Sequence, residues 1–110
     1  MKSYRELFIK KGFIFNGKSY KYKSYSENYF NLVKDILDGV HGNVPEPETL
    51  SEMFGKTIWT NYNDIPSGVK ERKLYKELGD IYVLGYKGVN DFNVLVKRIS
   101  KHINKQVVFC

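Results

Sequence analysis

The side chains most often used for metal binding and nucleophilic catalysis are few in this sequence. The 110 residues contain two histidines, His41 and His102, and one cysteine, Cys110. A zinc site needs several Cys, His or carboxylate ligands at close spacing, and an activated nucleophile needs a base beside it. We therefore expect no catalytic residue, no metal site and no cofactor. His41 is interpreted as a loop residue, with a catalytic base as the minor alternative, and His102 as a solvated residue at a helix end.

One combination of acids would suit a metal-dependent nuclease. Such sites place an acid upstream of a Glu-x-Lys or Asp-x-Lys run on a strand, so that carboxylates hold a divalent ion that activates water. Asp64 and the run Glu71-Arg72-Lys73 supply these residue types. The run is predicted to be helical, so the nuclease ranks third among the functions considered.

A second short run has the sequence context of an anion site. Gly85-Tyr86-Lys87-Gly88 follows a predicted strand and precedes a predicted helix, whose first amides could bind phosphate. It lacks both the P-loop and the dinucleotide-binding patterns. A turn is the favoured interpretation, and a phosphate contact by Lys87 and the amides of Asn90–Phe92 is the alternative.

The distribution of charge gives the strongest functional indication. The formal net charge is +6, with the bases concentrated before residue 26 and after residue 66 and the acids between them. Lysine and arginine contact phosphates, and aromatic rings stack on unpaired bases. The candidate nucleic-acid-binding residues are Lys18, Lys21, Lys23 and Tyr25 on a hairpin, Lys70, Arg72, Lys73 and Lys76 on one helix, and Lys97, Arg98 and Lys101 on another.

The plain alternative is that these lysines are solvated surface residues. There are fifteen Lys but three Arg, with nine Asn and no Ala, which is the residue usage of an AT-rich genome such as that of a low-GC bacterium or its phage. Part of the lysine excess would then be codon usage. If nucleic acid binds, the scarcity of arginine favours contacts to the phosphate backbone over base reading.

The acidic middle of the chain supports a competing hypothesis. A loop with two prolines, followed by a short predicted helix, presents acids next to apolar residues such as Val44, Leu50 and Met53. Charge of one sign steers association with a complementary protein surface. The chain would then be an inhibitor or adaptor of a host protein. The candidate residues of this interface are Asp38, Glu46, Glu48, Glu52 and Phe54.

A β-hairpin is predicted near the N-terminus, because Asn16-Gly17 is the strongest short-range hairpin signal. A two-residue turn places Phe13 opposite Tyr20, and Phe15 opposite Lys18. Phe13, Phe15, Tyr20 and Tyr22 would then share one face of the hairpin.

Helix starts are marked by capping boxes at Ser3–Glu6, Ser24–Glu27 and Thr49–Glu52. They predict helices over about 4–11, with a strand as the rival there, 26–38 and 50–54. The inward stripe of the second would be Phe30, Val33 and Leu37, joined by Tyr29 and Ile36.

Further elements are predicted in the second half of the chain. A helix capped by Ser67 would extend to about Leu78, with Val69, Leu74 and Leu78 inward. A buried strand would follow over about 80–86, then a helix over 91–103 capped by Asn90, then a short strand over 106–109. The segment 57–62 could be either extended or helical.

The hairpin also carries a resemblance. The run Phe13-x-Phe15-Asn16-Gly17-Lys18-x-Tyr20, followed by Ser24-Tyr25-Ser26 and a helix, loosely resembles small hairpin–helix modules appended to DNA-modification proteins. The resemblance covers about residues 12–38 of the 110. The Gly-Trp pattern that follows in those modules has no clear counterpart here, because Trp59 is displaced.

Together these patterns predict one α+β domain over residues 1–110, with a C-terminal βαβ-like segment and a small mixed or antiparallel sheet. No apolar run approaches the length of a membrane span, and the charged N-terminus does not suit a signal peptide, so a cytoplasmic protein is expected. The favoured function is non-catalytic binding of nucleic acid, as an accessory protein of a phage or low-GC bacterium. The patterns leave the oligomeric state undetermined.

Overall fold

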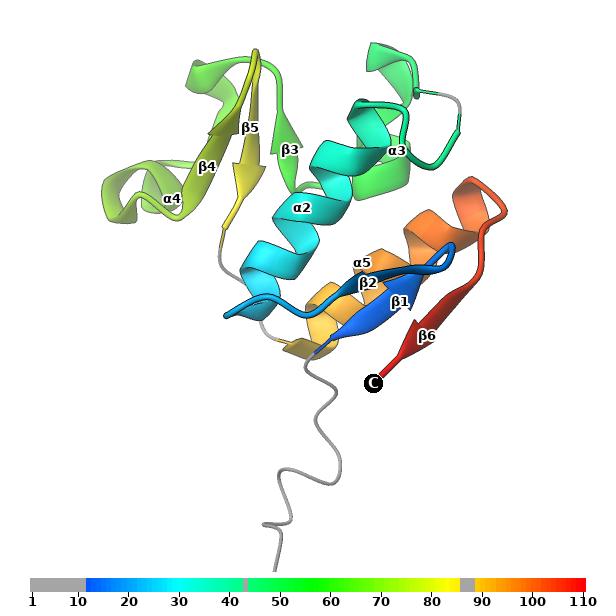
Figure 1. Cartoon of the computed structure of the whole chain (residues 1–110). Coiled ribbons are helices and arrows are strands. Elements are labelled where there is room, and N and C mark those ends of the chain that lie inside the picture. Colours follow the sequence, from blue (N-terminus) through cyan, green and yellow to red (C-terminus); the bar gives the residue numbers. More distant parts are fainter. Residues whose placement is uncertain (1–11, 43, 86–88) are drawn as a thin grey trace, which may run out of the picture.

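Short strands form two antiparallel three-stranded sheets in the computed structural model, which describes residues 12–42, 44–85 and 89–110 (Figure 1). The β1 sheet has the order β2-β1-β6, with bounds Lys18–Tyr20, Phe13–Phe15 and Val107–Phe109. The β5 sheet has the order β3-β5-β4, with bounds Ile58–Trp59, Ile81–Leu84 and Tyr75–Leu78. The fold is therefore α+β, as predicted.

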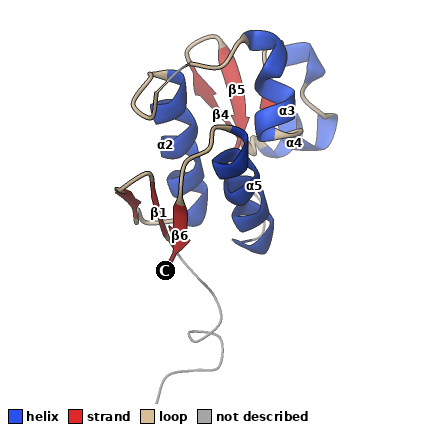
Figure 2. Cartoon of the chain, turned by 90° about the vertical axis from the view of Figure 1, so that its right-hand side faces the viewer, coloured by secondary structure: helices blue, strands red, loops and turns tan. Residues whose placement is uncertain are grey.

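The helices connect and cover these sheets. Their bounds are Tyr25–Leu37 for α2, Leu50–Phe54 for α3, Ser67–Arg72 for α4 and Val89–His102 for α5, with 3₁₀ turns at Pro47–Thr49 and Tyr62–Asp64. In Figures 1 and 2 the two sheets lie on different sides of α2, and α4 lies beside the β5 sheet, far from the β1–β2 hairpin. Helices α2 and α5 pack against each other.

The β1–β2 hairpin confirms the predicted register. Phe13 pairs with Tyr20 and Phe15 with Lys18, and the turn residues Asn16 and Gly17 have φ values of 49° and 85°. Positive φ at both positions defines the type I′ turn that the sequence indicates. The prediction for Tyr22 is wrong: β2 ends at Tyr20, and Tyr22 is 46% exposed.

Ser24 caps its helix as predicted, and Thr49 does not. The hydroxyl of Ser24 accepts a hydrogen bond from the Glu27 backbone N–H at 3.2 Å, which starts α2. Tyr29, Val33 and Ile36 are buried, whereas Phe30 and Leu37 lie only at the core edge. Thr49 makes no capping bond to α3, because its hydroxyl donates to the Glu46 carbonyl instead, at 2.8 Å.

The predicted helix over 67–78 is wrong in its second half. Helix α4 ends at Arg72, Lys73 adopts a left-handed conformation at φ 52°, and the chain continues as β4. Strand β4 pairs with β5 through a turn at Gly79-Asp80, so that Leu78 lies opposite Ile81. Pairing with a neighbouring strand outweighs the local helical pattern here.

The remaining predictions concern the flanks of the β5 sheet and the C-terminus. The undecided segment 57–62 contains β3 and the start of a 3₁₀ turn. Helix α5 begins at Val89, so Asn90 lies inside the helix and not at the predicted capping position. The final strand is present as β6. The helix expected over 4–11 lies outside the described residues.

One hydrophobic cluster joins both sheets to the helices between them. It contains Phe13, Phe15 and Tyr20 from the β1 sheet, Tyr29, Leu32, Val33 and Ile36 from α2, Phe54 from α3, Ile58 and Val83 from the β5 sheet, and Phe92, Val96 and Ile99 from α5. The helices that the structure describes include none with the length and hydropathy of a membrane span.

Candidate functional site

The outer face of the β5 sheet carries aromatic side chains. Ile58 and Val83 lie opposite each other and are buried, so they face the core. Neighbouring residues along a strand point to opposite faces of a sheet. Trp59 and its cross-strand partner Tyr82 therefore lie on the outer face, as does Tyr75.

A fourth aromatic residue joins this face from the segment between β3 and α4. Tyr62 begins a 3₁₀ turn whose start is fixed by Asn61, since the Asn61 side-chain oxygen accepts from the Asn63 backbone N–H at 2.9 Å. The Tyr62 ring lies 6.1 Å from the ring of Tyr75 and 5.8 Å from that of Tyr82, and those two rings are also 5.8 Å apart. We call Trp59, Tyr62, Tyr75 and Tyr82 the aromatic face.

Basic residues of α4 border the aromatic face. The Lys70 ammonium lies over the Tyr62 ring, 4.8 Å from its centroid, which is the geometry of a cation–π contact. Arg72 and Lys73 follow and are exposed to solvent. The acid Glu77 lies opposite Tyr82 on the same face. The positive charge is thus concentrated on the α4 side of the aromatic face.

The Tyr75 phenol of the aromatic face is neutral at physiological pH. Desolvation and the neighbouring Tyr62 hydroxyl raise the pKa of Tyr75 above its ordinary value of 10.0. A neutral phenol next to a lysine can stack on a base or donate a hydrogen bond to a phosphate without charge repulsion. Cations for phosphate and rings for bases are therefore present side by side.

The nucleic-acid-binding residues predicted on the hairpin have three different environments. The Lys18 ammonium is paired with the Asp35 carboxylate at 2.5 Å, whereas Lys21 and Lys23 are exposed. Tyr25 is 8% exposed and its ring stacks on Phe92, with centroids 5.6 Å apart and planes 15° apart. Tyr25 therefore belongs to the core and cannot serve as a stacking surface for a base.

The other basic candidates do not merge with α4 into one surface. Lys76 points to the opposite side of β4 from Tyr75, and its ammonium lies 5.3 Å from the centroid of Phe30. The candidates on α5, Lys97, Arg98 and Lys101, are exposed. Figures 1 and 2 both place α4 far from the β1–β2 hairpin. The helix predicted to unite Lys70, Lys73 and Lys76 ends before Lys76.

The acidic candidates remain at the surface, with one exception. Asp38, Glu46, Glu48 and Glu52 are exposed. Phe54 is fully buried, and Leu50 and Met53 also belong to the core, because α3 packs its apolar side against α5. Val40 and Val44 are 53% and 54% exposed and are the apolar residues left beside these acids.

The nuclease residues lie on α4 and the preceding turn. Glu71 is in the helix and Asp64 ends the 3₁₀ turn, so the Glu-x-Lys run is not on a strand. Within residues 12–42, 44–85 and 89–110, no three His, Cys, Asp or Glu side chains are grouped so that they could hold a metal ion. The candidate phosphate contact by Lys87 lies outside the described residues.

His41 lies in the loop after α2, as the sequence predicts, and its side chain is buried there. Its Nε2 lies 2.7 Å from the Tyr20 hydroxyl, and its Nδ1 lies 3.3 Å from the side-chain nitrogen of Asn16. The Tyr20 hydroxyl also donates to Asp35 at 2.6 Å. This network connects the turn and the second strand of the β1–β2 hairpin to the C-terminal end of α2.

Sequence reasoning missed the aromatic face, although a signal for it exists. Gly79-Asp80 is a two-residue turn signal between the runs Tyr75–Leu78 and Ile81–Leu84, and the second run is rich in β-branched and aromatic residues, which is a hairpin pattern. With that hairpin in place, Tyr75 and Tyr82 fall on one face. The chain matches no protein-family model, no curated protein and no solved structure at a significant level. No activity of a relative can therefore be transferred to these residues.

Proposed function

We propose that this protein binds single-stranded nucleic acid through the aromatic face, as a non-catalytic accessory protein acting in the cytoplasm. The observation that supports this most is the Tyr62–Tyr75–Tyr82 cluster with the Lys70 ammonium 4.8 Å from the Tyr62 ring. Proteins that bind single strands combine stacking rings with cations that follow the backbone. Lys70, Arg72 and Lys73 would contact phosphates.

The energetics of stacking favour an unpaired strand. Base–aromatic stacking contributes about 1–3 kcal/mol per base and tolerates any base, because every base has a π face. Tyr62 is 45% exposed and offers the most accessible ring among the three tyrosines. Bases in a duplex are stacked on each other, so a duplex could reach the cations of α4 but not these rings. The expected preference is single strand over duplex, with little sequence reading.

The test is a titration of fluorescently labelled oligo-dT and of a labelled duplex, followed by anisotropy. Tyr62→Ala should weaken oligo-dT binding by about tenfold, the loss expected for one stacked base. Tyr22→Ala is the matched control, because Tyr22 is 46% exposed but lies beyond the other sheet. Its affinity should equal that of the unmodified protein.

A second readout reports directly on the site. Trp59 is the single tryptophan of the chain and lies on the aromatic face. Stacking of a base nearby should quench its fluorescence at the same concentrations at which anisotropy rises. Equal losses in both Tyr variants, or binding without a Trp59 response, would show that the aromatic face is not the binding site.

The acidic region supports a second candidate function, binding to a protein. The supporting observation is that Val40 and Val44 are more than half exposed beside Asp38 and Glu46. Exposed apolar residues with acids around them suit a partner that has an apolar patch and a basic rim. A stoichiometric complex that survives nuclease treatment and is lost in Val44→Ser would support this function over nucleic-acid binding.

A further inference from the structure

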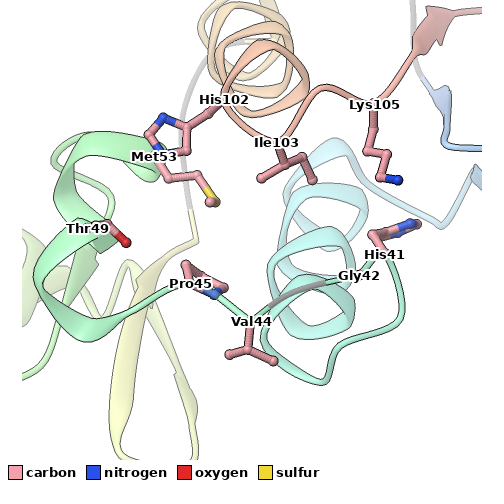
Figure 3. Close-up of a pocket in the computed structure, with 9 residues that line it drawn as sticks. All are labelled: His41, Gly42, Val44, Pro45, Thr49, Met53, His102, Ile103 and Lys105. Carbon is pink, nitrogen blue, oxygen red and sulfur yellow. The ribbon is translucent and has the colours of Figure 1, made fainter.

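A pocket of about 430 Å³ lies where the loop after α2, helix α3 and the end of α5 meet (Figure 3). The sequence places its residues far apart, and the fold brings both histidines of the chain to its wall. Pockets that hold small ligands begin at roughly 300 Å³ and combine an apolar lining with a few polar groups. The volume therefore suits a small organic molecule.

The lining is mixed, and four of its nine residues have apolar side chains. Val44 and Pro45 contribute from the loop, Met53 from α3 and Ile103 from the end of α5. In Figure 3 the side chains of Met53 and Ile103 are directed into the space between these elements. Thr49 adds a hydroxyl that already donates to the Glu46 carbonyl. Carboxylate side chains are absent from the described lining.

Lys105 gives the pocket a positive charge. Its side chain is half-buried and reaches toward His41 in Figure 3. No Asp or Glu of the described chain lies within ion-pair distance of its ammonium. A partly buried cation without a counter-charge is a favourable position for an anion, because the anion replaces lost hydration.

His41 forms a wall of the pocket and cannot itself hold the ligand through a ring nitrogen. The Asn16 amide donates to Nδ1, which assigns the ring proton to Nε2, and Nε2 then donates to the Tyr20 oxygen. The Tyr20 hydroxyl in turn donates to Asp35. Both ring nitrogens are used in this network, so the imidazole is neutral and faces the pocket with carbon atoms.

We propose that this pocket binds a small organic anion, with its carboxylate at Lys105 and its apolar body against Met53 and Ile103. His102, which is exposed at the opposite side of the opening, adds a second donor for a larger ligand. The residues involved differ from those of the aromatic face, so the two sites are independent and either can be wrong alone.

The test uses benzoate as the probe and neutral benzamide, of nearly the same shape, as its control. The imidazole carbon-bound protons of His41 and His102 are followed by NMR during each titration. Benzoate should shift both histidines and saturate, and benzamide should bind at least about tenfold more weakly, because it has no charge for the ammonium.

Variants distinguish binding in the pocket from non-specific binding to surface charge. Lys105→Gln should weaken benzoate binding by at least about tenfold, and Lys105→Arg should retain it. Lys101→Gln is the matched control, since Lys101 is an exposed lysine of α5 outside the pocket, and it should stay within about twofold of the unmodified protein. Three outcomes would overturn the proposal: no saturable shift, equal binding of benzamide, or equal losses in the Lys105→Gln and Lys101→Gln variants.

Discussion

His41 is the residue whose environment most changes its chemistry. Burial lowers the pKa of its imidazole below the ordinary value of 6.5, and the positive charges of Lys18 and Lys105 act in the same direction, while Asp35 opposes them. Burial would raise the pKa of Asp35, but its bonds from Lys18 and Tyr20 outweigh that effect and keep it below 3.8. The network therefore holds a neutral imidazole next to an ionised carboxylate.

The stability of the protein should fall on mild acidification. The unfolded chain takes up a proton on His41 near pH 6.5, whereas the folded chain resists it. More protons are then bound in the unfolded state, so the contribution of His41 is present above that pH and is lost as pH decreases toward the folded pKa. Urea unfolding at about pH 7 and about pH 5.5, a range in which histidine is the main titrating side chain, measures the loss.

The matching variants assign that loss to His41. His41→Gln should cost about 1–3 kcal/mol at neutral pH, because the buried Tyr20 hydroxyl loses the hydrogen bond from Nε2 and the packing of the buried imidazole is lost. The variant should also reduce the dependence of the free energy of unfolding on pH, whereas His102→Gln should leave that dependence unchanged. An unchanged slope in His41→Gln would show that another group causes it.

At the residue scale, residue type and spacing predict chemistry better than they predict exposure. Tyr25 and Tyr62 are both tyrosines near lysines, yet Tyr25 is 8% exposed and Tyr62 is 45% exposed. The difference arises because α2 places Tyr25 against Phe92, a residue distant in sequence. The burial of His41 has the same kind of origin, since its partner Tyr20 comes from the hairpin.

At the element scale, Gly17 and Gly68 can be compared directly, because a methyl group added at either would meet no neighbouring atom. Gly17 has φ 85° in the hairpin turn, so Gly17→Ala should destabilise by about 1–2 kcal/mol through backbone strain alone. Gly68 lies in α4 without a positive φ, so Gly68→Ala should stabilise by about 0.4–1 kcal/mol. Chemical denaturation of both variants measures the opposite signs, and equal signs would contradict the turn geometry.

The same contrast explains which elements the sequence could predict. The β1–β2 hairpin was predicted with its register because the Asn-Gly turn and the alternating aromatics lie within eight residues of each other. Strand β4 was taken for helix because the helical spacing of Val69 and Leu74 is local, whereas its pairing with β5 is formed by the fold. Lys73 in a left-handed conformation gives no sequence signal of the kind that glycine would give.

At the scale of the whole molecule, the basic segments are separated. The chain measures 47 × 34 × 19 Å along its principal axes, and α4 lies on the far side of α2 from the hairpin (Figure 1). A strand bound to the aromatic face would meet the three cations of α4 first. The net charge of +6 would therefore steer association more than it would hold the complex together.

The salt dependence of binding distinguishes a local site from one that uses all basic segments. The logarithm of the affinity of a single strand falls with the logarithm of salt concentration by about 0.7 per neutralised phosphate. Contacts from Lys70, Arg72 and Lys73 alone give a slope of about −2, so affinity for oligo-dT should fall about twentyfold between about 50 and 200 mM salt. If the hairpin and α5 also contact the strand, the loss of affinity over the same range should be roughly a thousandfold or more.

Two charge-removing variants test which contacts set this slope. Lys73→Gln should reduce the slope by about 0.7, whereas Lys23→Gln, on the hairpin side, should leave it unchanged. A steep slope that decreases equally in both variants would mean that the strand wraps around α2 and that the aromatic face is only one part of the interface.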